Sequence, residues 1–185
     1  EYIILLEALF GDNTGDILKL YPVGPFQKDT RPQLNDVLTD YLFLCSSRNL
    51  ANQMSLTQPK LPLYKYWFNH VISFYDSWGP NYEFCWFDYV CHASELPFVF
   101  DSAVLAGYNY TPEEQALALA MVGYWGNFAH TSDPNKGPFG TPNVLWPTYD
   151  NVNMRNLNLN LTIHEESAVR SDFCDYWDSV GYFQP

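Results

Sequence analysis

The sequence is poor in basic residues. Nine Lys and Arg stand against 21 Asp and Glu, which gives a formal net charge of −12. Binding to a phosphate backbone depends on clustered Lys and Arg, so this composition argues against a nucleic-acid partner. The sequence also lacks any run that approaches the roughly 18 consecutive apolar residues of a membrane helix, and it therefore predicts no membrane span.

Two kinds of motif are missing as well. The cysteines and histidines form no C-x-x-C or H-x-x-x-H pattern, so their spacing does not fit a zinc site. No other metal and no organic cofactor is predicted. The G-x-S-x-G turn of serine hydrolases is absent, and its nearest approach, YDSWG at 75–79, lacks the first glycine. The chain opens without methionine or a basic leader, inside a helix-like segment, so we expect it to be a piece of a longer protein.

What the sequence does contain is typical of a folded domain. Hydrophobic residues make up 47% of the 185 residues and aromatic residues 18%, which excludes a disordered chain. The length is sufficient for one domain with a sizeable core. Because no internal repeat or low-complexity linker interrupts the chain, we predict a single domain over residues 1–185.

The four cysteines are even in number, and Cys45, Cys85, Cys91 and Cys174 permit three pairings. Two N-x-T sequons occur, at Asn109 and Asn160. Pro112 follows the first sequon, and we expect it to hinder glycosylation there. Together, the even cysteine count and the sequons favour an oxidising, secreted setting.

Periodicity predicts several helices. Residues 2–10 have helical apolar spacing, and a second helix is expected over 41–54, capped by Thr39 or Asp40. The clearest helix follows Thr111, because Pro112 and Glu114 complete a capping box with it. A last helix is predicted over 171–180.

Two segments are predicted as strands. Residues 63–74 are rich in aromatic and β-branched residues and indicate a buried strand. Residues 156–163 alternate strictly between Asn or Thr and Leu or Ile, which indicates a half-buried strand. The mixture of helices and strands is typical of an α/β or α+β protein.

His92 is the candidate for chemistry. It lies between Cys91 and Glu95, just before the apolar run 96–100, which we expect to be a buried segment. If Cys85 and Cys91 pair, a short closed loop ends beside the imidazole and holds it still, as a proton shuttle requires. The alternative is a histidine with no chemical role, and the spacing alone supplies His92 with no nucleophile.

The other histidines have structural interpretations. His70 ends the first predicted strand and is expected to pack in the core. His130 is expected at a helix C-terminus, where positive charge is favourable. His164 follows the second predicted strand and is expected to be exposed.

Several segments resemble the C-terminal part of the carboxylesterase type B family, which includes cholinesterases and secreted lipases. They occur in the same order as in the family. The similarity extends over nearly the whole chain. CHASELPFVF at 91–100 is similar to the family's H-G-x-E-L-P-x-V-F histidine motif. The other segments are FG…ILKLYP at 10–22, LTDYLFLCSSRNLANQ at 38–53, LYKYWFNH at 63–70, YWGNFAHTSDPN at 124–135, LWPTYD at 145–150 and CDYWDS at 174–179.

The resemblance implies roles for particular residues. His92 falls on the catalytic histidine, which takes a proton from serine and returns it to the leaving alcohol. Glu95 falls on a buried supporting acid, and Ala93 replaces the usual glycine. The resemblance further implies that Cys45 pairs with Cys174, which leaves Cys85 to pair with Cys91.

The implied fold is α/β: the late sheet strands and packing helices of an α/β-hydrolase, incomplete as a domain. The implied function is that of a secreted serine carboxylesterase or lipase acting on small-molecule esters. Because the serine and the catalytic acid lie upstream in this family, we expect the chain alone to be inactive and to need the N-terminal part of the same protein. The alternative is a non-enzymatic adhesion or storage relative that keeps the fold without the nucleophile.

Overall fold

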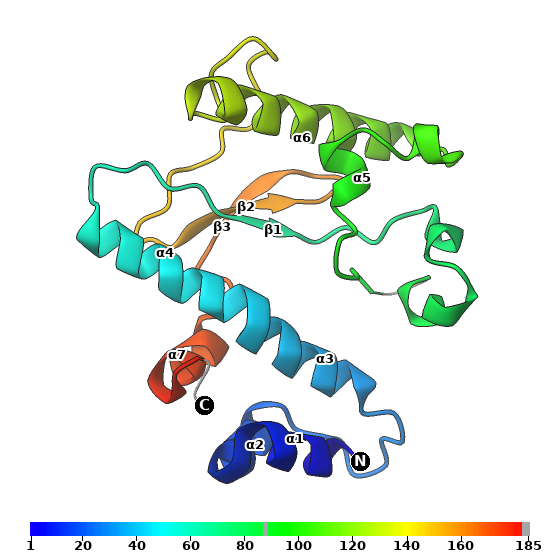
Figure 1. The fold of residues 1–185 in the computed structure, drawn as a ribbon, viewed down its shortest axis with the longest axis vertical. Coiled ribbons are helices and arrows are strands. Elements are labelled where there is room, and N and C mark those ends of the chain that lie inside the picture. The colour runs from blue at the N-terminus through cyan, green and yellow to red at the C-terminus, as the bar shows by residue number, and fades with distance from the viewer. Residues whose placement is uncertain (87–88, 183–185) are drawn as a thin grey trace. The chain divides into compact units, whose positions relative to one another are not determined.

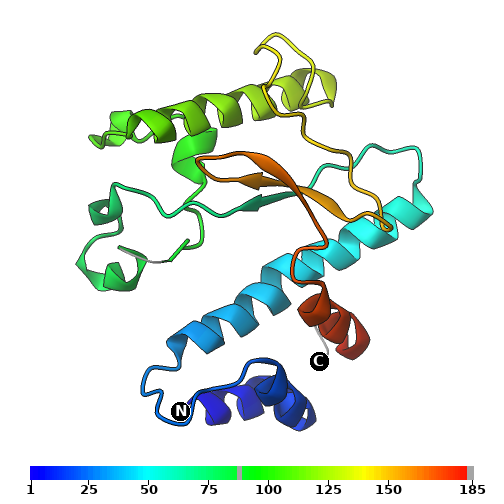
Figure 2. The ribbon, with the colours of Figure 1, turned by 180° about the vertical axis from the view of Figure 1, so that it is seen from behind.

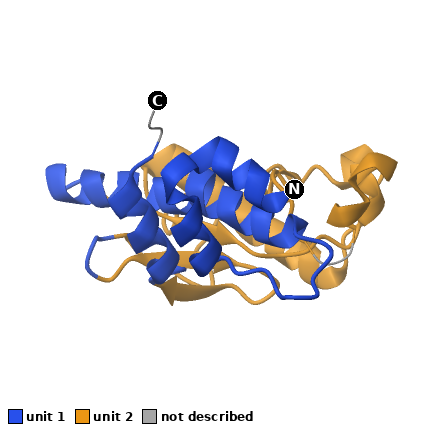
Figure 3. Ribbon diagram, turned by 90° about the horizontal axis from the view of Figure 1, so that it is seen from below, with its two compact units in different colours: residues 1–61, 150–152, 168–185 blue, residues 62–149, 153–167 orange. Residues whose placement is uncertain are grey.

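The computed structural model describes residues 1–86 and 89–182, which group into two compact units (Figure 3). Unit 1 comprises residues 1–61, 150–152 and 168–185, and unit 2 comprises residues 62–149 and 153–167. Each unit is therefore assembled from segments that are far apart in the sequence. No helix within the described residues has both the length and the apolar character that a transmembrane span requires.

Unit 1 is helical. It begins with α1 (Tyr2–Phe10), which ends at Gly11 as predicted, and α2 (Thr14–Leu20). The next helix starts earlier than predicted: α3 (Arg31–Thr39), a π-helical segment (Asp40–Leu44) and α4 (Cys45–Thr57) run on as one rod (Figure 1 and Figure 2).

The prediction that Thr39 or Asp40 caps a helix was wrong. Asp40 lies inside the rod, and its carboxylate is 1% exposed. It accepts hydrogen bonds from the Tyr21 hydroxyl (2.7 Å) and from Nε of Arg170 (2.7 Å). These partners neutralise and satisfy a buried charge, so a residue type favoured at caps is tolerated within the helix.

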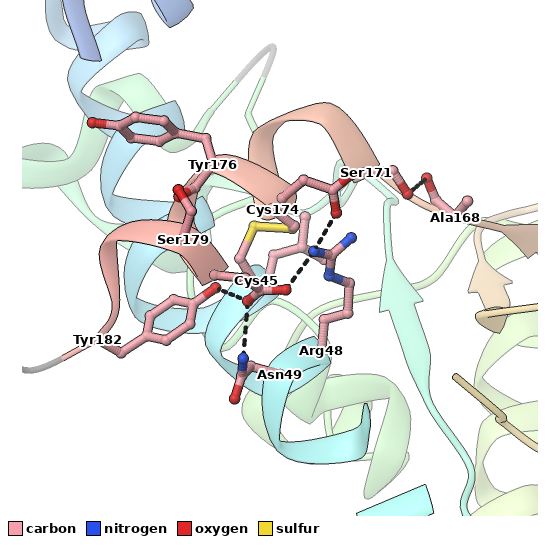
Figure 4. A network of polar contacts seen from close by, with 12 residues as sticks. Cys45, Arg48, Asn49, Ala168, Ser171, Cys174, Tyr176, Ser179 and Tyr182 are labelled. Atoms are coloured by element: carbon pink, nitrogen blue, oxygen red, sulfur yellow. Dashed lines mark hydrogen bonds and ion pairs between the residues drawn. A yellow bond between two sulfur atoms is a disulfide. The ribbon is translucent and has the colours of Figure 1, made fainter. Parts of the chain in front are cut away.

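The C-terminal helix α7 (Ser171–Val180) has the predicted bounds and is fastened to α4 (Figure 4). The disulfide Cys45–Cys174 joins the two helices. The buried Arg48 side chain donates to Asp175 (2.7 Å) and Asp178 (2.5 Å) on α7. Covalent and charge-assisted contacts together hold the last helix onto a segment more than a hundred residues away.

Unit 2 contains a three-stranded sheet in the order β1-β2-β3. β1 (Tyr66–Phe68) and β2 (Arg155–Leu159) are parallel, with Tyr66 opposite Leu157; β2 and β3 (His164–Ser167) are antiparallel. Both predicted strands were too long. Ile72 and Phe74 lie outside β1 and are buried in the hydrophobic core without strand pairing.

The second strand was also expected to be half-buried, and this was wrong. Leu157 and Leu159 enter the core, but Asn156 and Asn158 on the opposite face are buried too. The Asn158 side chain donates to Glu166 of β3 at 2.8 Å. Alternation of Asn and Leu thus marks two faces of different chemistry, both removed from solvent.

The long helix of unit 2 is α6 (Pro112–Thr131), and it packs against the one-turn helix α5 (Leu96–Val99) (Figure 1). The predicted capping box is present: the Glu114 N–H donates to the Thr111 hydroxyl, and the Thr111 N–H donates to the Glu114 carboxylate. Three short 3₁₀ segments, Tyr75–Trp78, Pro80–Cys85 and Val104–Ala106, complete the unit.

Candidate functional site

His92 lies in a hydrogen-bonded turn that leads directly into α5. The Ser94 N–H donates to the Cys91 carbonyl (3.0 Å), and the Leu96 N–H donates to the Ala93 carbonyl (3.2 Å). Ser94 is buried, whereas His92 is exposed. The turn therefore fixes the backbone of a residue whose side chain is exposed.

Ala93 holds an unusual backbone conformation in this turn. Its φ is +71°, in the left-handed region that costs an L-residue with a Cβ about 1–2 kcal/mol. A glycine adopts such a φ without that cost, because it has no Cβ. The alanine that stands where the resembling family has glycine is thus strained, and the strain lies directly beside His92.

The disulfide Cys85–Cys91 fixes the other side of His92. The two Cα atoms lie 5.8 Å apart, and the cysteines are six positions apart in the sequence. Cys85 is buried, so the crosslink attaches the turn to the body of unit 2. The loop closed by this disulfide includes residues 87 and 88, which lie outside the described part of the chain.

Phe98 anchors α5, which continues the turn. Its side chain is 0% exposed, and its ring lies 5.6 Å from that of Phe68, 5.7 Å from His70 and 5.2 Å from Tyr110. The apolar run 96–100 was expected to be a buried segment, but Leu96 and Phe100 are exposed and only Phe98 is fully buried. Phe98 therefore anchors α5 in the hydrophobic core.

Glu95 immediately precedes α5 as its N-cap residue, and it is half-buried rather than fully buried. It helps to line a hollow of about 440 Å³, together with Tyr66, Trp125 and Phe139. Burial and the negative charge of Glu95 raise the pKa of the Tyr66 hydroxyl. Glu95 thus lies in an aromatic environment three positions after His92.

A second polar cluster, which sequence reasoning missed, surrounds Glu114. The carboxylate is 1% exposed. It accepts hydrogen bonds from the Ser73 N–H (2.7 Å), the Ser73 hydroxyl (2.5 Å) and the Thr111 N–H (2.9 Å), and it pairs with Nε2 of His70 at 2.9 Å. Burial disfavours the charge, but these hydrogen bonds outweigh it and lower the pKa of Glu114. Only the capping box was readable from the sequence.

The cluster changes the interpretation of His70. The ring is buried and packs against Phe98 and Phe68, as expected of a core histidine, but it also pairs with a carboxylate. Although serine, histidine and glutamate meet here, the serine hydroxyl donates to the glutamate. The arrangement therefore fits a satisfied buried network rather than a nucleophile activated by a base.

The remaining predicted residues lie apart from His92 in the sequence. Asn109 is exposed, whereas Asn160 is half-buried and its side chain donates to the Asn69 carbonyl (2.5 Å). His130 is in the last turn of α6, and His164 is exposed in β3. Among residues 1–86 and 89–182, no three His, Cys, Asp or Glu side chains gather as a metal site would need.

The chain resembles known proteins over almost its whole length. A model of the carboxylesterase family matches residues 14–177. The cAMP-regulated D2 protein of Dictyostelium discoideum is 35% identical over 92% of this chain and 30% of its own length. The Crystal protein of the same organism is 34% identical over 98% of this chain and 32% of its own.

An enzyme is among the relatives. Acetylcholinesterase 1 of Caenorhabditis elegans is 34% identical over 80% of this chain and 23% of its own length. The chain spans less than a third of the length of each of these relatives.

Proposed function

Because the chain belongs to the carboxylesterase family, we propose that it is the C-terminal part of a serine ester hydrolase and that His92 is its proton-transferring residue. In this reaction the imidazole accepts the proton of a serine hydroxyl as the serine attacks the ester carbonyl. The imidazolium then returns the proton to the leaving alcohol. Water then takes the place of the serine as nucleophile, and the same proton transfers release the acid from the acyl-serine.

One observation carries this proposal: an exposed imidazole on a turn that is fixed from both sides. A base must reach the hydroxyl it deprotonates, which requires exposure, and must be held within hydrogen-bond distance of it, which requires a rigid support. His92 has both properties. His70, by contrast, is buried.

The serine, the catalytic acid and the oxyanion-hole donors belong, in this proposal, to polypeptide outside these residues. The sequence has no G-x-S-x-G turn, and the chain spans less than a third of its relatives. Large apolar side chains close to His92 in the sequence are open to solvent, with Phe100 71% and Leu105 88% exposed. Exposed apolar surface of this kind favours cover by further protein. Alone, the chain should not hydrolyse esters.

Glu95 serves in this proposal as the supporting acid. Its side chain, three residues after His92 and half-buried, would act on His92 through a water or through the adjoining part of the site. Two disulfides fit a protein that folds in an oxidising, extracellular compartment. Asn109 is the better placed of the two sequons for a surface glycan, although Pro112 follows it.

A second candidate is a relative without enzymatic activity. Two relatives from Dictyostelium discoideum, the cAMP-regulated D2 protein and the Crystal protein, support this candidate, since neither name states a reaction. In that case the fold would serve adhesion or storage. The two candidates differ in one feature, the presence of a serine nucleophile in the part of the protein that precedes His92.

The test is hydrolysis of p-nitrophenyl acetate and butyrate by the complete protein that contains this chain. His92→Ala should lower kcat by at least about a thousandfold, as loss of a triad member does. His164→Ala is the matched control, because His164 is also exposed, and it should leave kcat unchanged. Equal activity of the His92 variant and the unaltered protein would refute the role of His92.

A further inference from the structure

We propose that Glu114 is a positioning residue for His92. Its carboxylate binds the two residues that flank the chain segment carrying the histidine. The inference rests on the proposed function of His92, and it adds a residue that neither the motif nor the capping box assigns to the site. Glu114 does not lie in the His92 turn, so it would act through the segment 74–110.

Two positions bound this segment, and both are tied to the same carboxylate. Ser73 immediately precedes it and donates its N–H to Oε1 (2.7 Å) and its hydroxyl to Oε2 (2.5 Å) of Glu114. Thr111 immediately follows it and donates its N–H to Oε2 at 2.9 Å. One buried side chain thus holds the N-terminal and the C-terminal end of the segment together.

A contiguous set of contacts connects this closure to the turn. Tyr110, next to Thr111, donates its hydroxyl to the Pro97 carbonyl of α5 at 2.7 Å. Its ring lies 5.2 Å from that of Phe98 and 5.6 Å from that of Phe74, the residue next to Ser73. The side chains adjoining the two ends therefore meet each other and α5, which begins directly after the His92 turn.

The carboxylate is specifically required, because every partner of known polarity at the site donates to it. Oε2 accepts from the Ser73 hydroxyl and the Thr111 N–H, and Oε1 accepts from the Ser73 N–H. A glutamine of the same shape would replace one acceptor oxygen with an NH₂ group that faces a donor. At a site 1% exposed, no solvent is available to relieve that mismatch.

The chain offers a matched control at the neighbouring position. Glu113 is also an acid in the first turn of α6, but it is exposed. Glu113→Gln and Glu114→Gln remove the same charge from the same helix terminus. An effect that both variants share therefore comes from the lost interaction of the charge with the helix dipole. A difference between them reports the buried contacts.

The experiment compares the two variants in the complete protein that contains this chain. Hydrogen–deuterium exchange is followed in the peptide 92–100, which includes the Ser94 and Leu96 amides, and in α7 as a reference for overall stability. The ring signal of His92 is followed by NMR with ¹³C-labelled histidine. Neither measurement needs an ester substrate, so failure of the proposed hydrolase function would appear only in the hydrolysis assay.

Glu114→Gln should accelerate exchange in 92–100 by about tenfold or more, the effect of losing a buried charge-assisted hydrogen bond. It should also broaden or split the His92 signal, with α7 and the Glu113→Gln protein unchanged. Unchanged exchange in 92–100 and an unchanged His92 signal in Glu114→Gln would overturn the proposal, as would the same effect from Glu113→Gln. If Glu114→Gln fails to fold, Ser73→Ala removes one contact: faster exchange in 92–100 supports the proposal, and no change refutes it.

Discussion

Ala93 follows His92 directly in a left-handed conformation, with φ +71°, so the residue that adjoins the proposed base is under backbone strain. Ala93→Gly should relieve it and raise the free energy of unfolding by roughly 0.5–1 kcal/mol, because the gain at positive φ exceeds the added entropy of glycine in the unfolded chain. Urea unfolding at neutral pH measures the change.

Ala116→Gly is the control for this substitution. Ala116 is exposed in the interior of α6, where glycine should lower the free energy of unfolding by about 1 kcal/mol. The same chemical change is therefore expected to have opposite signs at the two positions. Destabilisation by Ala93→Gly would show that the left-handed turn is not present in solution.

The two disulfides should contribute unequally to stability. The Cys45–Cys174 bridge spans 129 positions and the Cys85–Cys91 bridge six. In the loop-entropy model the longer closure is worth about 4–5 kcal/mol and the shorter about 2 kcal/mol. Paired Cys→Ala variants, compared by urea unfolding, test this order. A larger loss from the short bridge would mean that it stabilises unit 2 by some means other than chain entropy.

The ion pair of Arg170 with Asp40 should matter more than that of Arg31 with Asp29. The Asp40 side chain is 1% exposed, whereas that of Asp29 is 52% exposed. Arg170→Gln leaves a buried carboxylate without its cation and should cost about 3–5 kcal/mol. Arg31→Gln should cost less than about 1 kcal/mol, since solvent screens the exposed pair. Thermal unfolding compares the variants, and equal losses would contradict the burial of Asp40.

Stability should fall in acid partly because of Glu114. Its pKa is lowered in the folded protein from the ordinary 4.5, so the folded state binds this proton less readily than the unfolded chain. The resulting stabilisation is present above pH 4.5 and is lost as the pH falls through the lower folded value. Glu114→Gln should flatten the decline in unfolding free energy below pH 5, with Glu113→Gln as the control. An unaltered slope would show that Glu114 does not titrate as inferred.

Local signals in the sequence were sufficient for several helices. The capping box at Thr111 and Glu114 is formed by residues three positions apart, and α6 begins where it predicts. The bounds of α7 also match the prediction. Residues close in sequence decide where such a helix starts, so the pattern can be read without knowledge of the rest of the fold.

Long-range contacts account for the errors. Asp40 was read as a cap because aspartate favours caps, but Arg170, 130 positions away, stabilises it inside a helix. The segment 63–74 was read as one strand because it is rich in aromatic and β-branched residues, but the pairing with β2 is confined to Tyr66–Phe68. Glu114 was assigned one role because His70 and Ser73 are distant in sequence. The motif around His92 was readable, whereas the network that holds its segment was not.

The proposed coupling of His92 to a serine outside these residues is tested most directly with a fluorophosphonate probe, which labels serine only when a base activates it. The complete protein should be labelled at one serine, located by mass spectrometry outside this sequence of 185 residues. His92→Ala should slow labelling by at least about a hundredfold, since the base that activates the nucleophile is lost. Absence of label from the unaltered protein, or labelling of the His92 variant at the same rate, would contradict this account.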